Sequence, residues 1–172
     1  MTTSPSGVEA YRLGRTYEVM PIPMVPDRCV EVPAGALTFI VESRNLSDEA
    51  INANALDRGR PDQTVDTGID DGGACIHVVG TADGLEWLRF DCFDNEPHYH
   101  YVRHGEQANQ VVRFDQFAEG DPQAWTLERL RTRLPAMLRY AGAGDLADAV
   151  AAADLTGAVD EVASVLDRLG AS

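Results

Sequence analysis

Residues 74–117 hold a run of short β-type segments joined by short connectors, and this run constrains the fold more than any other part of the chain. The segments are 74–80, 85–93, 98–103 and 110–117. Each is rich in β-branched or aromatic residues, and the connectors are turn-rich. Connectors this short leave no room for a crossover helix, so consecutive segments must pair as antiparallel neighbours. The sequence therefore predicts an antiparallel β meander, with a further strand over 36–43.

The segments before and between these strands have different characters. Four prolines between residues 9 and 35 exclude a helix there and suit edge strands or extended loops. Ser47 is a good helix cap, so a short helix is expected over 48–56. Residues 57–73 are acidic and rich in turn formers, which predicts a long loop.

The C-terminal part is helical in pattern from residue 121 onward. One apolar stripe is formed by Leu127, Leu130, Leu134, Met137 and Leu138, and Pro135 should kink or divide this helix. Further helices are expected near 146–153 and 157–169. We expect these helices to cover one face of the sheet in a single α+β domain spanning 1–172, mainly β over 9–120 and helical over 121–172.

The charge balance limits the classes of partner. The chain has 28 acidic and 14 basic side chains, for a net charge of -14, so nucleic acid and anionic membranes are not expected as partners. All the basic residues are arginine, which indicates a GC-rich bacterial genome and excludes Schiff-base lysine chemistry. The three cysteines fit no metal or redox motif. With no signal peptide and no membrane span in the sequence, we expect a cytoplasmic protein.

Chemistry is suggested by the histidines, three of which fall within residues 98–104. On a strand, His98 and His100 point to one face, whereas Tyr99 and Tyr101 point to the other. Two imidazoles on one face commonly bind one metal ion.

The spacing His98-x-His100 resembles the first metal motif of the cupins over about ten residues. In that family a glutamate follows the second histidine after three or four residues, and another histidine lies on a later strand. Here five residues separate His100 from Glu106, and no histidine follows His104. The cupin glycine frame is also missing, so membership in that family is not predicted.

The expected strand pairing sorts the side chains into two faces. Folding each connector about its middle pairs Phe93 with His98, Asp91 with His100 and His77 with Trp87. It also pairs His100 with Arg113 and His98 with Asp115. One face becomes apolar. The other collects His77, Trp87, Arg89, Asp91, Phe93, His98, His100, Arg113 and Asp115.

The residues on this polar face predict a metal site that acts on or binds a small anionic molecule. The ligands would be His98, His100 and His77, with Asp91 or Asp115 completing the shell of a divalent Zn, Fe, Mn or Ni ion. Arg89 and Arg113 would orient the anion, and Trp87 and Phe93 would line its pocket. No organic cofactor is predicted.

Two alternatives stay open on the sequence alone. The polar face could be solvated in a non-catalytic binding module, because antiparallel sheets often bury one face and wet the other. An organic anion could also bind to Arg89, Arg113 and the histidines without a metal. Whether the protein is an enzyme is therefore undecided. A homodimer is a further expectation, through a sheet edge at 36–43.

Overall fold

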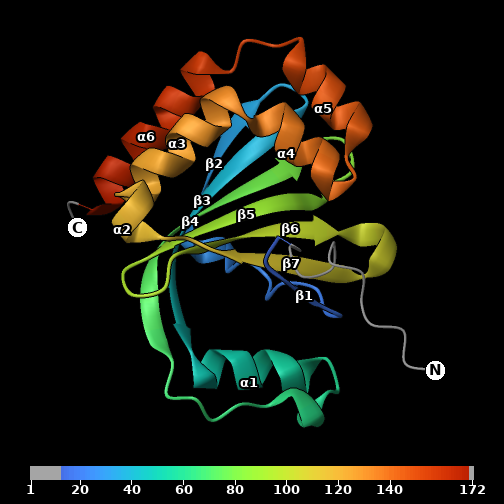
Figure 1. The fold of residues 1–172 in the computed structure, drawn as a ribbon, viewed down its shortest axis with the longest axis vertical. Coiled ribbons are helices and arrows are strands. Elements are labelled where there is room, and N and C mark those ends of the chain that lie inside the picture. Colours follow the sequence, from blue (N-terminus) through green and yellow to red (C-terminus); the bar gives the residue numbers. More distant parts are fainter. Residues whose placement is uncertain (1–12, 171–172) are drawn as a thin grey trace.

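The chain folds around one seven-stranded antiparallel sheet, seen in a computed structural model that describes residues 13–170 (Figure 1). The strand order is β1-β7-β6-β5-β4-β3-β2. The strands are β1 Arg15–Tyr17, β2 Cys29–Ala34, β3 Leu37–Ser47, β4 Asp70–Gly80, β5 Glu86–Phe93, β6 His98–Arg103 and β7 Ala108–Arg113. The expected α+β fold with its meander is confirmed. Residues 1–12, which bear on the expected absence of a signal peptide, lie outside the described residues.

The strand boundaries differ from expectation at several places, among them β3, which continues to Ser47 instead of ending at residue 43. β4 begins at Asp70, inside the predicted loop, and Gly73 allows this because a Cβ there would clash with the Cys92 carbonyl oxygen. β7 ends at Arg113 rather than at residue 117, because Asp115 caps the short helix α2 (Gln116–Glu119) instead of continuing the strand. β3 is hydrogen-bonded to strands on both sides, so the expectation that it forms a sheet edge was wrong.

The observed register differs from the predicted one by two residues in each hairpin. Asp91 pairs with His98, His98 with Arg113, and His77 with Arg89. Two local irregularities contribute to the shift: a one-residue bulge at Val78/Val79 in the first hairpin and a 3-10 turn, His104–Glu106, in the last. Because side chains alternate with a period of two, a two-residue shift changes the neighbours but keeps each residue on its face.

Helices cover one face of the sheet (Figure 1). They are α3 Pro122–Thr132, α4 Leu134–Ala141, α5 Gly144–Ala151 and α6 Thr156–Gly170. The stripe is divided at Arg133, and Pro135 stands in the first turn of α4, as its missing N–H requires. Leu130, Leu134 and Leu138 are buried in the same core as strand residues Ile76 and Phe90. Each such fully buried side chain contributes about 1.5–3 kcal/mol.

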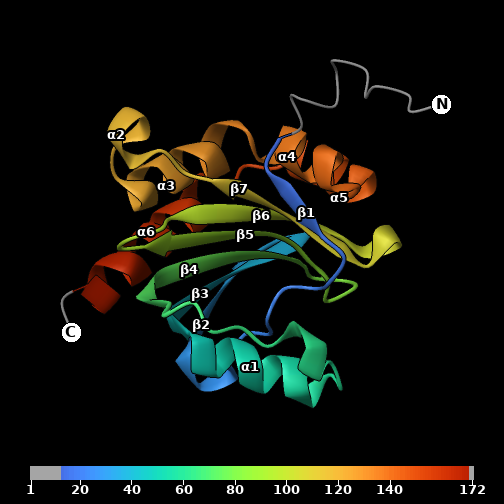
Figure 2. The same cartoon turned by 60° about the horizontal axis from the view of Figure 1, so that its bottom comes forward.

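The opposite face of the sheet is covered by the chain's own N-terminal segment. After β1 at one edge, residues 19–25, here called the strap, run beneath the sheet toward β2 at the other edge (Figure 2). Polar contacts tie the strap to β3 and β7: Arg44 donates to the Ile22 and Pro23 carbonyls, Glu42 accepts from the Val25 N–H, and Asn109 donates to the Val19 carbonyl. The prolines expected to give edge strands or loops thus also give a covering segment.

The expectation that this polar face is solvated is therefore wrong for most of the face. His77, Arg89, Asp91 and His100 are all buried. A buried charge needs a partner, so this face must satisfy its own polar groups.

The helix α1 (Asp48–Asp57) lies on the strap side of the sheet, away from α3–α6 (Figure 2). Ser47 caps it by accepting from the Ala50 N–H, as expected. Among the described residues, no helix combines the length and apolar character needed to cross a membrane.

Candidate metal centre

Asp91, His98 and His100 converge at the centre of the covered face. Asp91 lies on β5, directly opposite His98 on β6, and His100 follows two residues later on the same face. The Nε2 atoms of His98 and His100 lie 3.0 and 2.9 Å from one carboxylate oxygen, Asp91 Oδ2. The three ligand-type atoms all lie within 4.8 Å of one another.

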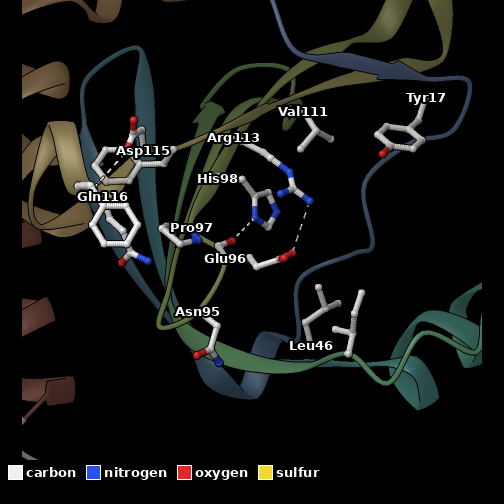
Figure 3. A pocket seen from close by; sticks show the side chains of 13 residues that line it. Tyr17, Leu46, Asn95, Glu96, Pro97, His98, Val111, Arg113, Asp115 and Gln116 are labelled. Carbon is white, nitrogen blue, oxygen red and sulfur yellow. Dashed lines mark hydrogen bonds and ion pairs between the residues drawn. The ribbon is translucent and has the colours of Figure 1, made fainter.

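The other nitrogen of each imidazole is held by an oxygen acceptor. His98 Nδ1 donates to the Glu96 carbonyl over 2.8 Å, the contact dashed in Figure 3, and His100 Nδ1 donates to Asn109 Oδ1 over 2.9 Å. With the proton fixed on Nδ1, a neutral imidazole presents a lone pair at Nε2. Metal-binding histidines are oriented in this way by their outer-shell partners.

The Asp91 carboxylate is deeply buried and only partly satisfied. Its Oδ1 accepts no hydrogen bond from the described residues. Burial alone would raise the pKa of Asp91, but hydrogen bonds from His100 and His98 outweigh it and hold this pKa well below its ordinary value. For His98, burial lowers the pKa, yet the contact with Asp91 raises it overall. The centre thus requires positive charge, supplied either by protons on the imidazoles or by a cation.

The donor set fits a divalent transition metal. Two imidazole nitrogens and one carboxylate oxygen form the two-histidine, one-carboxylate set of open metal sites. The Asp91–histidine separations of 2.9 and 3.0 Å are hydrogen-bond distances, and a bound ion would take the place of the shared protons.

His77 belongs to a different group of residues. Its Nε2 lies 2.9 Å from Glu42 Oε2 and its Nδ1 lies 2.5 Å from Glu86 Oε1. Burial lowers the pKa of His77, but these two carboxylates raise it overall, as expected for an imidazolium held between them. The structure therefore does not bring His77 to His98 and His100.

A metal is a poor fit at this second group, although Glu42, Cys75 and His77 lie close together. Glu42 Oε2 already accepts from Arg44 over 3.1 Å, and its Oε1 accepts from the Val25 N–H. Burial and the nearby Asp91 charge raise the pKa of Cys75 well above its usual value, which disfavours the thiolate that a metal needs. We interpret this group as a buried salt-bridge cluster.

The two arginines expected to orient an anion differ in availability. Arg89 is buried, and its guanidinium donates to both oxygens of Glu86 over 2.7 and 2.8 Å, so it is already paired. Arg113 lies opposite His98 and is exposed, with a loose 3.8 Å contact to Glu96. Figure 3 shows Arg113 and Glu96 on either side of His98.

Asp115 and Trp87 lie away from the centre. Asp115 is exposed and accepts from the Phe117 and Ala118 N–H groups as the cap of α2. Trp87 is the extra residue of the bulge, so it packs against the main core and His104 instead of joining the polar face. Phe93 stays on the predicted face, with its ring 5.5 Å from that of His98.

Two cavities open beside His98, which lines both; Asp91 and His100 line neither. The larger, of about 550 Å³, also includes Tyr17, Val111, Arg113 and Phe117 (Figure 3). The smaller, of about 260 Å³, includes Phe93 and the start of β4. An exogenous ligand would therefore approach an ion from the His98 side.

Sequence reasoning missed the residues that orient the histidines. Asn109 shares a face with Arg113 on β7, a parity that could have been found had β7 been extended to residue 108. Asp71 accepts from the backbone N–H groups of Asn95 and Glu96 and so fixes the turn that carries the Glu96 carbonyl. No sequence pattern indicated that the strap covers the sheet, because its contacts join residues far apart in the chain.

Comparison with known proteins identifies the family of this chain. No curated protein and no solved structure matches the chain. One family model, described as a domain of unknown function (DUF7700), matches residues 31–166. The matched region contains Asp91, His98, His100 and Asn109 and begins after the strap. The chain therefore belongs to the DUF7700 family.

Proposed function

We propose that Asp91, His98 and His100 bind one divalent transition metal ion, and that the protein is a metal-dependent enzyme or metal-supported binder of a small anionic molecule. The observation that carries the proposal is the convergence of both Nε2 atoms on Asp91 Oδ2 while both Nδ1 atoms donate to oxygen acceptors.

The ligand set leaves coordination positions for other molecules on the cavity side. A bound ion of this kind acts as a Lewis acid and lowers the pKa of water, and with iron the same ligands support oxygen chemistry. Arg113, exposed beside His98, is the cation that would pair with an anionic ligand. Arg89 does not have this role, because its guanidinium is already paired with Glu86.

The location proposed for this chemistry is the bacterial cytoplasm. Cys29, Cys75 and Cys92 are all free, which supports a reducing compartment.

The proposal is tested by reconstituting metal-free protein with Mn²⁺, Fe²⁺, Ni²⁺ and Zn²⁺ and measuring the bound metal after desalting. We expect about one ion per chain in the wild-type protein, because three ligands converge on one point. We expect substoichiometric metal in Asp91→Asn, His98→Ala and His100→Ala, since each loses a ligand. His104→Ala is the matched control from the same histidine cluster, because His104 donates to the Glu86 carbonyl instead.

A protonated, metal-free centre is the rival state. Wild-type protein that retains no ion, or equal retention in His98→Ala and His104→Ala, would reject the metal centre. In that case Asp91 would hold two protonated histidines as a structural cluster, and the non-catalytic binding module would be the better description.

A further inference from the structure

Asn109 joins the candidate metal centre to the strap. It is buried, and both ends of its amide are used: Oδ1 accepts from His100 Nδ1 over 2.9 Å, and Nδ2 donates to the Val19 carbonyl over 2.7 Å. Because the two ends of an amide have opposite hydrogen-bonding roles, the Val19 carbonyl determines which end faces His100.

This orientation decides where His100 keeps its proton. With Oδ1 facing the ring, Nδ1 is the donor, and the lone pair of the neutral imidazole lies at Nε2, on the Asp91 side. A reversed amide would present N–H to Nδ1 and move the proton to Nε2, where it would block an ion. The backbone of the strap thus selects the tautomer that a metal requires.

The strap is held at its other end by a separate set of contacts. Arg44 donates to the Ile22 and Pro23 carbonyls over 3.4 Å each, and the Val25 N–H donates to Glu42 over 3.0 Å. Pro21 and Pro23 have no N–H, so this stretch offers mainly carbonyl acceptors to the polar face. The strap is therefore anchored beside both polar clusters.

We propose that Asn109 is a positioning residue for the metal centre and that it couples ion binding to docking of the strap. The inference rests on the metal centre proposed above. Docking fixes the Asn109 amide and prepares His100 for the ion. By thermodynamic reciprocity, an ion bound to His100 stabilises the docked strap by the same free energy.

Zn²⁺ affinity, measured by competition with a chelator, tests the positioning role. Asn109→Leu should weaken Zn²⁺ binding 10- to 100-fold, the range found when an outer-shell partner of a ligating histidine is removed. Asn52→Leu is the matched control. Asn52 also pins a remote segment through both ends of its amide, at Val65, but it lies on α1 outside the centre, so its loss should leave Zn²⁺ affinity unchanged.

Asn109→Asp separates the two contacts of the amide. A carboxylate still accepts from His100 Nδ1, so Zn²⁺ affinity should recover most of the loss, but it has no N–H for the Val19 carbonyl. Hydrogen exchange of the peptide covering the strap reports the coupling. Zn²⁺ should slow this exchange in the wild-type protein and leave it unchanged in Asn109→Asp. A merely structural asparagine would not show this divergence.

The outcomes distinguish the two proposals. Wild-type protein that binds none of Mn²⁺, Fe²⁺, Ni²⁺ and Zn²⁺ overturns the metal centre and the coupling with it. If another of these ions binds in place of Zn²⁺, the same affinity and exchange measurements use that ion. If the wild-type protein binds Zn²⁺, two results overturn the coupling alone. One is that Zn²⁺ does not change the hydrogen exchange of the strap, and the other is that Asn109→Leu binds Zn²⁺ as tightly as the wild-type protein. Should Asn109→Leu not fold, Asn109→Asp carries the test, because equal strap protection by Zn²⁺ in that variant and in wild type also overturns the coupling.

Discussion

The same residue type has opposite roles on one face of this sheet. His77 faces a carboxylate at each ring nitrogen, so it is fully engaged as a cation. His98 and His100 each have one nitrogen turned to a neutral oxygen acceptor and the other to Asp91. The partners at the ring nitrogens, rather than histidine itself, separate a salt-bridge residue from a candidate ligand.

His77 should make the stability of the metal-free protein depend on pH. Its pKa is raised on folding, so the stability from its charge is fully present below about pH 6.5 and is lost as pH rises through the raised folded pKa. We expect His77→Gln to cost about 3–5 kcal/mol at pH 6, as when one partner of a buried pair is removed. The cost should shrink at higher pH. Urea unfolding in EDTA at pH 6 and pH 8.5 measures both.

The difference between the two proteins isolates His77, because His98 titrates in both. Glu86, whose pKa burial would raise but His77 and Arg89 lower to about 2, stays charged across this range. A pH-independent gap between wild type and His77→Gln would show that His77 is not a cation in the folded state.

At the scale of elements, the turn between β5 and β6 is organised from a third strand. Asp71, at the start of β4, accepts from the N–H groups of Gly72, Asn95 and Glu96 and from the Asn95 side chain. These contacts place the Glu96 carbonyl on His98 Nδ1. The hairpin that carries the histidines therefore depends on β4 for its turn.

Asp71→Ala should lower both stability and metal affinity. Losing the charged acceptor should cost about 1.5–3 kcal/mol, because hydrogen bonds to charged groups have this value. Zn²⁺ affinity should fall about tenfold as His98 loses its fixed orientation. Asp70→Ala is the control, since the neighbouring Asp70 is exposed and makes a single weak contact with Asn45. Equal unfolding midpoints and Zn²⁺ affinities in the two variants would contradict this role for the turn.

At the scale of the whole molecule, a net charge of -14 opposes an anionic ligand. The larger cavity adds Glu96 and Asp115 to this field, against the single guanidinium of Arg113. An anion should therefore bind only after a divalent ion has bound. The same field attracts cations to the centre.

Calorimetry with oxalate tests this order of binding. We expect binding to Mn²⁺-loaded protein and none to EDTA-treated protein. Arg113→Gln should weaken oxalate binding about two- to fivefold, the effect of a solvent-exposed charge. Arg139→Gln, which removes an equal charge from an exposed pair on α4, should not. Oxalate binding to metal-free protein, or equal losses in both variants, would exclude the proposed order.

The sequence by itself determined the fold class and the faces of the sheet. Short connectors forced an antiparallel meander, and the period of two placed Asp91, His98 and His100 together even though each predicted register was two residues off. The bulge moved only Trp87 off its predicted face, because an extra residue breaks the alternation of side chains. That His98 and His100 lie on the same face was therefore predictable, as was the side of the sheet to which they belong.

Only the tertiary structure decided which polar residues form the centre and whether water reaches them. Those outcomes depend on contacts across long sequence separations: Val19 with Asn109, Glu42 with His77, and Asp71 with Glu96. Local propensity and periodicity act over a few residues and have no information on such pairs. The strap converts a face that the sequence left open to solvent into a buried one, and burial makes the partners of each charge decisive.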